Sequence, residues 1–309
     1  MGSWTRESGI AEMTTPDATV GTIAAARASR GLWSDAIRRL LRNRPALIGL
    51  AIILIFVVLA IFAPLIAPYD SLETIRGQVF KPPSLEHLMG TDKQSRDVLS
   101  RILFGARISL FVGVVSVLMG LAMGGTVGAI AGAFGGRIDA ILMRSVDVLL
   151  SIPGILLAIG IVVWLDRGLI QIMFAVAATN APIFARILRG SMLSLREADY
   201  VIAARSIGAP TGRILLRHML PNALTPIIVT STLALATAII DVAGLGFLGL
   251  GPADPRTAEW GTMLTDASSF YRQAPWIIFF TGAAISLSAI GFNLLGDGLR
   301  ESLDPRMRR

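Results

Sequence analysis

The stretch ISLFVGVVSVLMGLAMGGTVGAIAGAF, residues 108–134, contains no charged side chain. A helix of about 20 mostly apolar residues crosses the roughly 30 Å hydrocarbon layer of a membrane, so this stretch is long enough to span one. The whole chain agrees, because 53% of its 309 residues are hydrophobic, 16% are charged and its mean hydropathy is +0.67. That balance differs from the one typical of soluble domains. The sequence therefore predicts an integral membrane protein.

Five more segments have the same apolar character and predict five more spans. They cover residues 46–67, 148–165, 168–185, 223–240 with an extension to 247, and 274–296. Only Asp166 and Arg167 separate the third span from the fourth, so this pair predicts a tight hairpin. Helices satisfy their own backbone hydrogen bonds inside a membrane. The predicted fold class is therefore all-α, a polytopic bundle of six transmembrane helices.

The distribution of Lys and Arg predicts the orientation of these spans. With residue 1 in the cytoplasm, 19 of the 28 Lys and Arg residues fall in cytoplasmic segments and 9 in the others, as the positive-inside rule expects. We therefore predict a multi-pass protein of the plasma (inner) membrane with both termini in the cytoplasm. Its predicted parts are a mobile cytoplasmic tail at 1–35, a first span with its approach at 36–67, an extracytoplasmic segment at 68–107, a core of five spans at 108–297 that holds a cytoplasmic loop at about 190–222, and a cytoplasmic end at 298–309.

The composition excludes several kinds of site. The chain has no cysteine, which rules out disulfides, thiolate metal sites and cysteine nucleophiles. Neither His87 nor His218 has a second ligand nearby at metal spacing, so we expect no metal site. The net charge of +7 comes from cations spread between apolar runs, which favours membrane orientation over nucleic-acid binding. We expect membrane lipid as a partner, no nucleic acid, and no cofactor on this chain.

Glycine recurs at every fourth position along the second span. The five residues are Gly120, Gly124, Gly128, Gly132 and Gly136. This spacing places them along one side of a helix, and small residues let two helix backbones approach closely in lipid. The stripe predicts a close contact with another helix. We favour a fixed contact, within this chain or with a partner, and the alternative is a contact that moves.

The loop between the fourth and fifth spans carries a helix pattern of its own. It reads SLREADYVIAARSIGAPTGRILLRHMLPNALTP at residues 194–226. Ser194 followed by Glu197 has the spacing of a capping box, which marks a helix start, and Gly208 followed by Pro210 marks a helix stop. These signals predict a cytoplasmic helix over residues 195–207.

One face of that helix is predicted to be apolar. Tyr200, Ala203, Ala204 and Ile207 follow the spacing i, i+3, i+4 and i+7. An apolar face outside the membrane has to be covered. The cover is provided by the span ends of this chain, by lipid headgroups or by a groove in a soluble partner, and the pattern alone does not choose among them.

The same loop resembles a known family motif. Residues 200–208, YVIAARSIG, followed by RHMLPN at 217–222, resemble the EAA loop of permease subunits in binding-protein-dependent ABC importers. In that family the loop forms a coupling helix that docks into a groove of the ATPase subunit. The family's glutamate falls on Ile202, a departure that removes any polar contact the glutamate would make. The resemblance implies an ATPase-coupling set that consists of Glu197, Tyr200, Ala203, Ala204, Arg205, Ile207, Gly208, Leu220, Pro221 and Asn222.

Three further segments resemble the C-type permease of the peptide and nickel branch. They are HLMGTD at 87–92 with RDVLSR at 96–101, GFLGLG at 246–251 with WGTML at 260–264, and NLLGDGLR at 293–300 with LDPR at 303–306. Where relatives often carry a glutamate before the second of these segments, this chain has Val242 with Asp241 beside it. The resemblance runs from about residue 40 to the end and implies the type I ABC importer permease fold.

The resemblance also implies partners and a division of labour. The expected partners are a homologous second permease, two ABC ATPase subunits or one fused ATPase, and an extracytoplasmic substrate-binding protein. This chain has no G-x-x-x-x-G-K-[ST] phosphate loop, so we expect it to be a non-catalytic translocation subunit, with ATP and Mg²⁺ on the ATPase subunits. The implied function is uptake of dipeptides or oligopeptides by alternating access.

A few polar residues inside the spans are candidates for the translocation pathway. Thr230, Ser231, Thr237 and Asp241 lie on the fifth span. Their alternative roles are hydroxyl bonds to their own helix and, for Asp241 and for Asp147 on the third span, local pairing or contact with water near a span end. We favour that local role for both aspartates.

Three other functions compete with peptide uptake. The first is uptake of nickel or another small solute by the same kind of importer. The second is secondary transport driven by an ion gradient, which predicts acidic groups at mid-membrane and broken helices in related halves. The third is a membrane scaffold with no transport role, which predicts no vanadate-sensitive uptake.

Overall fold

A computed structural model describes residues 37–252, 254 and 256–303. Their α-helices are α2 (Arg44–Ile61), α3 (Ala63–Ile66), α4 (Val98–Phe134), α5 (Gly136–Leu150), α6 (Gly154–Leu165), α7 (Leu169–Arg196), α8 (Asp199–Ser206), α9 (Thr211–Ile214), α10 (Leu224–Leu245), α11 (Trp260–Ser268) and α12 (Pro275–Leu303). Short π- or 3₁₀-helical turns, η1 (Leu215–Met219), η2 (Pro221–Ala223) and η3 (Gly246–Leu250), flank α10. The all-α prediction is confirmed for this part of the chain. The predicted tail at 1–35 and the cations at 306, 308 and 309 lie outside it.

Five helices are long and apolar enough to cross a membrane, and a bent helix pair makes a sixth span if its two halves count together. The pair is α5 and α6, which meet at an angle of 91°. The third span, predicted at 148–165, is therefore bent within that range, and its first helix begins earlier, at Gly136. Pro153 lies at the bend, where proline lacks the N–H for a helix hydrogen bond and disfavours helical backbone in the residue before it.

Two other predicted boundaries shift because helices continue past them. α4 begins at Val98, so the last part of the predicted segment 68–107 is helical. Asp97 caps this start by accepting a hydrogen bond from the Ser100 N–H, which is a common helix-start device. α12 continues to Leu303, past the predicted boundary at 297, and Asn43 at the start of α2 hydrogen-bonds Glu301 near its end.

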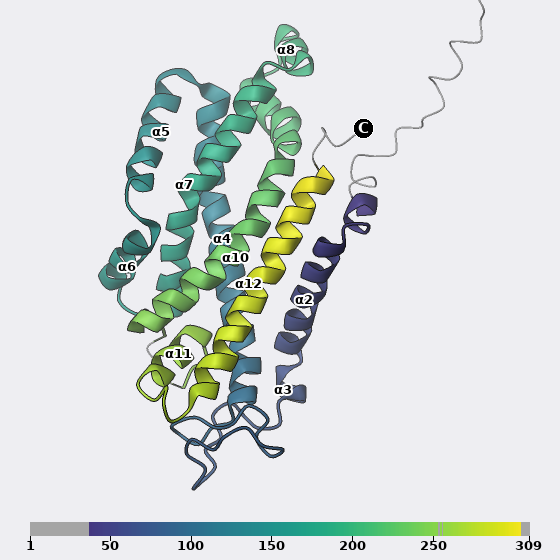
Figure 1. Cartoon of the computed structure of the whole chain (residues 1–309). Coiled ribbons are helices and arrows are strands. Elements are labelled where there is room, and N and C mark those ends of the chain that lie inside the picture. Colours follow the sequence, from purple (N-terminus) through teal and green to yellow (C-terminus); the bar gives the residue numbers. More distant parts are fainter. Residues whose placement is uncertain (1–36, 253, 255, 304–309) are drawn as a thin grey trace, which may run out of the picture.

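The centre of the bundle is the contact between α4 and α7, which run side by side (Figure 1). Added methyl groups at Gly120, Gly124, Gly128 and Gly132 would collide with or crowd α7, at Gly120 by coming within 2.9 Å of the Ala177 carbonyl oxygen. The backbones approach this closely only because these positions lack a side chain. Gly136 does not belong to the stripe, since it starts α5 beyond the turn at Gly135 and has open space around it.

A second contact holds α2 against α12. A methyl group added at Gly49 would meet the Gly291 carbonyl oxygen at 2.6 Å. α10 lies between α12 and the α4–α7 pair and contacts all three. The spans therefore share two buried apolar clusters, one around α4, α6, α7 and α10 and one around α2, α4, α10, α11 and α12.

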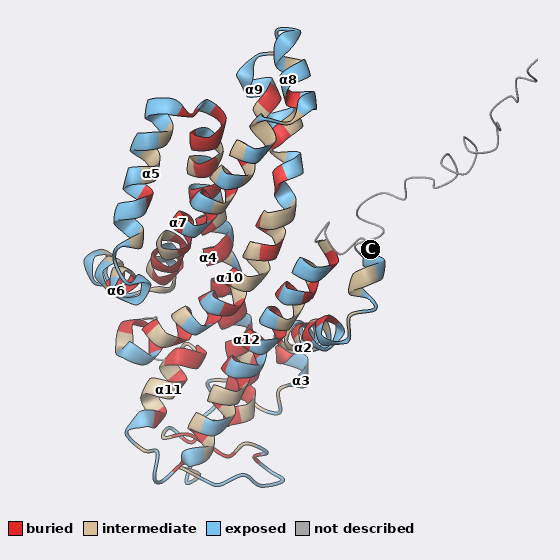
Figure 2. Ribbon diagram, turned by 45° about the horizontal axis from the view of Figure 1, so that its top comes forward, coloured by how far each residue is buried: buried red, intermediate tan, exposed pale blue. Residues whose placement is uncertain are grey.

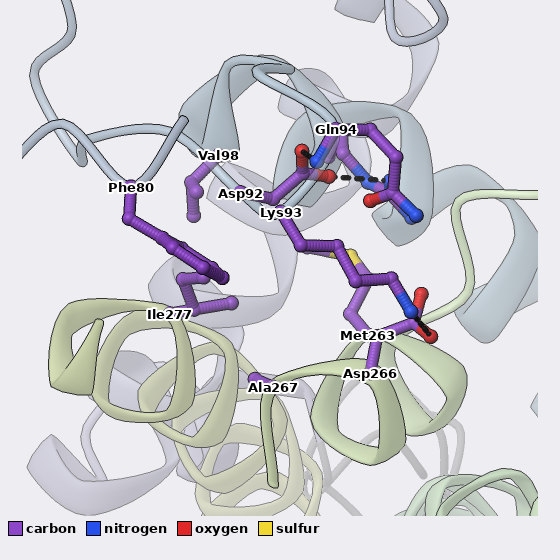
Figure 3. Close-up of a pocket in the computed structure, with 10 residues that line it drawn as sticks. Phe80, Asp92, Lys93, Gln94, Val98, Met263, Asp266, Ala267 and Ile277 are labelled. Atoms are coloured by element: carbon purple, nitrogen blue, oxygen red, sulfur yellow. Dashed lines mark hydrogen bonds and ion pairs between the residues drawn. The ribbon is translucent and has the colours of Figure 1, made fainter. Parts of the chain in front are cut away.

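Segment 68–97 and α11 close one end of the bundle, and we call them the cap. Asp92 accepts charged hydrogen bonds from Arg96 at 2.7 Å and Arg101 at 2.8 Å, all three being largely buried. Lys93 reaches across to Asp266 of α11, and Phe80 and Ile277 line the other side of the same pocket (Figure 3). Trp260, fully buried, donates its indole N–H to the Ile102 carbonyl of α4. These contacts fix the cap onto α4 and α12.

Candidate functional site

The end of the bundle opposite the cap carries a helical hairpin at residues 198–223, which we call the coupling hairpin. It consists of α8, α9, η1 and η2 and projects beyond the ends of α7 and α10 (Figure 1). α7 leads into the hairpin and α10 leads out of it. Two long helices that cross the bundle are thus joined through this one structure.

The hairpin helix α8 is shorter than the sequence predicts. α7 continues to Arg196, so Ser194 lies inside a helix and Glu197 is the residue at its C-terminal end. α8 then starts after Ala198, which has extended backbone and no side-chain cap. The predicted capping box at Ser194 and Glu197 is therefore wrong, because the fourth span does not stop at residue 185 but continues as helix through both positions.

Gly208 ends α8 as predicted, in a left-handed conformation with φ of +79°. The Gly208 N–H donates to the Arg205 carbonyl at 3.0 Å, and the Ala209 N–H donates to the Ala204 carbonyl at 3.1 Å. This pair of bonds is a Schellman motif, in which glycine avoids the steric cost of a β-carbon. Pro210 follows and cannot continue the helix. The direction of the chain after α8 thus depends on one glycine.

One side of α8 is buried inside the hairpin. Val201 is fully buried and packs in one apolar cluster with Ile214, Met219 and Ala223 of the returning arm. Ala204 is half-buried against the same cluster. The sequence pattern did not single out Val201, because its burial depends on residues more than ten positions away in the chain.

The other side of α8 carries exposed apolar side chains. Ile207 is 86% exposed and Tyr200 is 42% exposed, and Ala203 is exposed between them. Ile202, at the position of the motif's glutamate, is 47% exposed, and Leu216 on the returning arm is 66% exposed. Figure 2 shows most of α8 coloured as exposed. Of the four predicted face residues, only Ala204 turns partly inward.

The remaining coupling candidates lie around this surface. Glu197 and Arg205 are exposed and form no ion pair within the part of the chain that the structure describes. Leu220 is half-buried and Pro221 starts η2. The Asn222 side chain donates to the His218 carbonyl at 2.6 Å and so stiffens the turn into α10.

Charged pairs brace α7 just below the hairpin. Arg189 of α7 donates to both carboxylate oxygens of Asp139 on α5, from Nε at 2.5 Å and from Nη2 at 2.7 Å. Arg186 binds Asp147 at 2.7 Å. Asp147 therefore pairs with another helix, as its favoured local role suggested, although not with a neighbour on α5.

The pathway candidates on α10 separate into two groups. Thr230, Thr237 and Asp241 lie within about 40° of one another around the helix, whereas Ser231 is about 80° from Asp241. Thr237 is exposed and Asp241 half-buried. The Thr230 and Thr237 hydroxyls donate to carbonyls of their own helix, at Pro226 and Ala234. Within the described residues no three His, Cys, Asp or Glu side chains are grouped to hold a metal ion.

Comparison with known proteins adds two family matches, which cover the chain except for residues 1–30 and 84–123. Residues 124–309 match the family described as binding-protein-dependent transport system inner membrane component. Residues 31–83 match the N-terminal TM domain of oligopeptide transport permease C.

Individual relatives agree with these matches. The dipeptide transport system permease protein of Alkalihalophilus pseudofirmus is 46% identical over 89% of this chain and 90% of its own. The oligopeptide transport system permease protein of Bacillus subtilis is 43% identical over 91% and 92%. The glutathione transport system permease protein of Pectobacterium atrosepticum is 42% identical over 89% and 92%.

One solved structure has a similar fold. A chain of the MetNI methionine ABC transporter, in an inward-facing conformation, aligns with 67% of this chain and 97% of its own length. The TM-score is 0.54 and the sequence identity 19%. At this identity the likeness concerns the fold alone.

Proposed function

Because the chain belongs to the inner membrane components of binding-protein-dependent transport systems, in their C-type peptide permease branch, we propose that it is the peptide-conducting subunit of an ATP-driven importer. The relatives named above carry dipeptides, oligopeptides and glutathione, which share a peptide backbone. We propose that class of substrate for this chain, in preference to nickel or to transport driven by an ion gradient.

The observation that carries this proposal is the exposed apolar side of α8. Ile207, Tyr200 and Ala203 face away from the bundle while Val201 holds the helix onto the returning arm. An apolar surface that is exposed to water outside the membrane raises the free energy of the protein, and covering it with a partner lowers that free energy. We propose that an ABC ATPase subunit covers it, and that Glu197 and Arg205 flank the contact. Lipid headgroups and the chain's own spans, the other two covers, fit less well because α8 projects beyond the helix ends.

The mechanism follows from how the hairpin is joined to the spans. Movement of α8 by a closing pair of ATPases acts on α7 and α10 together, because the hairpin connects their ends. The buried cluster around Val201 and the turn at Asn222 limit how much of that movement is lost inside the hairpin. If the hairpin and the two spans move as one rigid element between two positions, the contact at α8 changes the side of the membrane to which the translocation pathway is open. We place ATP and Mg²⁺ on the ATPase subunits and no catalysis on this chain.

We further propose the side of the membrane on which each end lies. The start of α2, the end of α12 and the coupling hairpin lie at one end of the bundle (Figure 1), and the hydrogen bond from Asn43 to Glu301 joins the first two. The excess of Lys and Arg predicted for this end supports a cytoplasmic location. The cap is then extracytoplasmic, where a substrate-binding protein delivers its peptide.

The pathway is proposed to follow the side of α10 that carries Thr230, Thr237 and Asp241. Asp241 forms no ion pair within the described residues, so we propose a pathway role for it in place of the local pairing favoured from the sequence. Its carboxylate has the chemistry to attract the ammonium group of a peptide. A homologous second permease is proposed to supply the facing wall. Ser231, the fourth pathway candidate, lies about 80° from Asp241 around the same helix.

The experiment that tests the proposal measures retention of the ATPase by the purified assembly. Ile207→Asp places a charge in the proposed contact and is expected to lose the ATPase and substrate-stimulated ATP hydrolysis. Leu85→Asp is the matched control, since Leu85 is 99% exposed and lies in the cap at the other end. Retention of the ATPase by Ile207→Asp at the level of Leu85→Asp would refute the docking proposal.

A second measurement tests the orientation. The chain lacks cysteine, so Tyr200→Cys creates a unique thiol. In intact cells or spheroplasts an impermeant maleimide is expected to react only after the membrane is opened. Labelling without opening would place the hairpin outside and refute the proposal.

A further inference from the structure

Two open cavities meet on α4 beside Arg107. The first, about 430 Å³, has a polar wall that includes Ser71, Asp254, Arg256 and Thr257. The second, about 550 Å³, is lined by Ala60, Ile61, Phe111, Leu169 and Met173, all apolar. Arg107 and Ile108 belong to both cavities. The first cavity, which Leu72, Phe104 and Ala258 also line, is called the polar cavity after its charged and hydroxyl side chains, and the second is called the apolar cavity. The two adjoin at Arg107 and Ile108.

The two cavities are arranged along the membrane normal in a definite order. Phe104 lines the polar cavity and Phe111 the apolar one, so the change of character takes place over about 10 Å of helix. Arg107 lies just before the uncharged stretch that begins at Ile108. The polar cavity thus lies at the cap end and the apolar cavity extends toward the middle of the membrane.

Arg107 lies where the two cavities adjoin. It is exposed, and within the described residues it joins no ion pair. Asp254, the acidic residue of the polar cavity, already binds Arg256 at 3.1 Å. An arginine at the edge of the hydrocarbon layer requires an anion or water for its guanidinium. Its planar fork of N–H donors matches phosphate oxygens especially well.

We propose that these cavities hold one glycerophospholipid, with its phosphate against Arg107 and an acyl chain beside Ile108, Phe111 and Met173. A lipid has the required sequence of a negative group followed by an apolar chain, in the same order along the membrane normal. A second permease subunit would have to place an acidic side chain next to an apolar surface at this depth, and we make that outcome part of the test. The proposal requires only that the chain is embedded in a membrane and is independent of what it transports.

The test uses the full chain in its purified assembly, in nanodiscs of phosphatidylcholine and phosphatidylglycerol with a trace of phosphatidylglycerol that carries a diazirine on its acyl chain. After illumination, mass spectrometry is expected to place the label on Ile108, Phe111 or Met173. Label spread evenly over the exposed faces of α2, α7 and α12, with none concentrated here, would overturn the proposal without any variant.

Arg107→Gln is expected to lower that labelling about tenfold, the ratio that loss of one charged hydrogen bond gives. Arg107→Lys keeps the charge but not the planar fork, so it is expected to lower the labelling by a smaller factor. Arg272→Gln is the matched control, because Arg272 lies at the same end, stacks over Tyr271 and lines neither cavity. Equal labelling of all variants would overturn the role of Arg107.

Two further outcomes identify a different occupant. Excess glycerol phosphate is expected to leave most labelling intact, because the acyl chain contributes to binding; complete competition would mean that the site recognises a free phosphate group only. A photoreactive phenylalanine analogue at Phe111 is expected to cross-link lipid. Cross-linking of a second permease subunit instead would assign this face to an interface between subunits and overturn the proposal.

Discussion

The cap and the coupling hairpin, at the two ends of one bundle, differ in which side chains they bury and which they expose. In the cap, Asp92 is buried and bound to the buried cations Arg96 and Arg101, and hydrogen bonds of Glu259 and Trp260 attach α11 to α4. In the hairpin the apolar residues Ile207 and Leu216 are exposed, and its charged residues form no ion pair with any residue that the structure describes. A surface made of buried charges keeps one shape because each group needs its partner. A surface made of exposed apolar groups is completed by another molecule.

The largest expected effect that tests this contrast comes from removing the central anion of the cap. Asp92→Ala leaves Arg96 and Arg101 buried without their carboxylate, which costs about 3–5 kcal/mol of folding free energy. We expect a large loss of folded protein in detergent, measured by size-exclusion yield and by thermal unfolding. The hairpin control is Arg205→Ala, whose side chain is exposed and whose loss should leave yield unchanged.

Equal stability of Asp92→Ala and Arg205→Ala would contradict the contrast, because it would mean that the buried charges of the cap are not what holds it together. A substitution of Asp92 by Asn sharpens the result. It keeps the shape of the side chain and one acceptor oxygen while removing the charge. An intermediate stability for Asn would separate loss of charge from loss of hydrogen bonds.

The next effect is a dependence on pH that should arise in the cap. Glu259, between the fifth and sixth spans, is fully buried and accepts hydrogen bonds from the Gly261 and Thr262 N–H groups at 2.8 Å. Burial raises the pKa of Glu259 to about 6 from 4.5, although these hydrogen bonds act in the other direction. A raised pKa in the folded state means that the unfolded protein loses this proton first as pH rises. The free energy of unfolding is therefore expected to fall by about 2 kcal/mol in total as the pH rises from well below 4.5 to well above 6.

Chemical unfolding of the reconstituted protein across this pH range measures that slope. Glu259→Gln cannot ionise and should flatten it. Glu73→Gln, an exposed carboxylate in the same cap, serves as the control and should leave the slope as it is. A slope that survives in Glu259→Gln would show that other groups cause it.

These two cases also show what sequence patterns reveal and what they miss. Hydropathy alone predicts the spans, because an apolar run of sufficient length has few alternatives to crossing the membrane. The bend at Pro153 was readable from proline chemistry, and the cap of α4 from Asp97 followed by Ser100. Burial of Asp92, Glu259 and Val201 was not readable, because each is buried by residues distant in sequence, such as Arg101, Ser109 and Ile214.

In the coupling hairpin, too, some sequence predictions are correct and others are wrong. Helical spacing correctly placed Tyr200, Ala203 and Ile207 on one face, and the glycine rule correctly ended α8 at Gly208. The predicted start of α8 is wrong because α7 continues as helix to Arg196, so the capping pattern at Ser194 and Glu197 does not begin a new helix. Local signals are reliable here only where no long helix passes through them.

A smaller effect is expected from the hairpin itself, at Gly208. Valine at this left-handed position costs about 1–2 kcal/mol, which should redirect the chain after α8 without affecting insertion. If all of that strain opposes docking, substrate-stimulated ATPase activity falls by a factor of about 5 to 30. Asparagine tolerates the same conformation, so Gly208→Asn should keep most of the stimulation. Unchanged stimulation in Gly208→Val would mean that the position of α8 is not what couples the two subunits.

The smallest effect comes from the cap's exposed ion pair, Lys93 with Asp266, and it sets the limit of the contrast. Their nitrogen and oxygen lie 2.6 Å apart, but the side chains are 33% and 37% exposed, so water screens the pair and it contributes at most about 1 kcal/mol. A double-mutant cycle with Lys93→Met and Asp266→Asn in thermal unfolding should give a coupling energy near this limit. A coupling energy as large as the effect of Asp92→Ala would show that exposed charges also stabilise the cap. Burial of charged pairs would then not be what distinguishes the cap from the coupling hairpin.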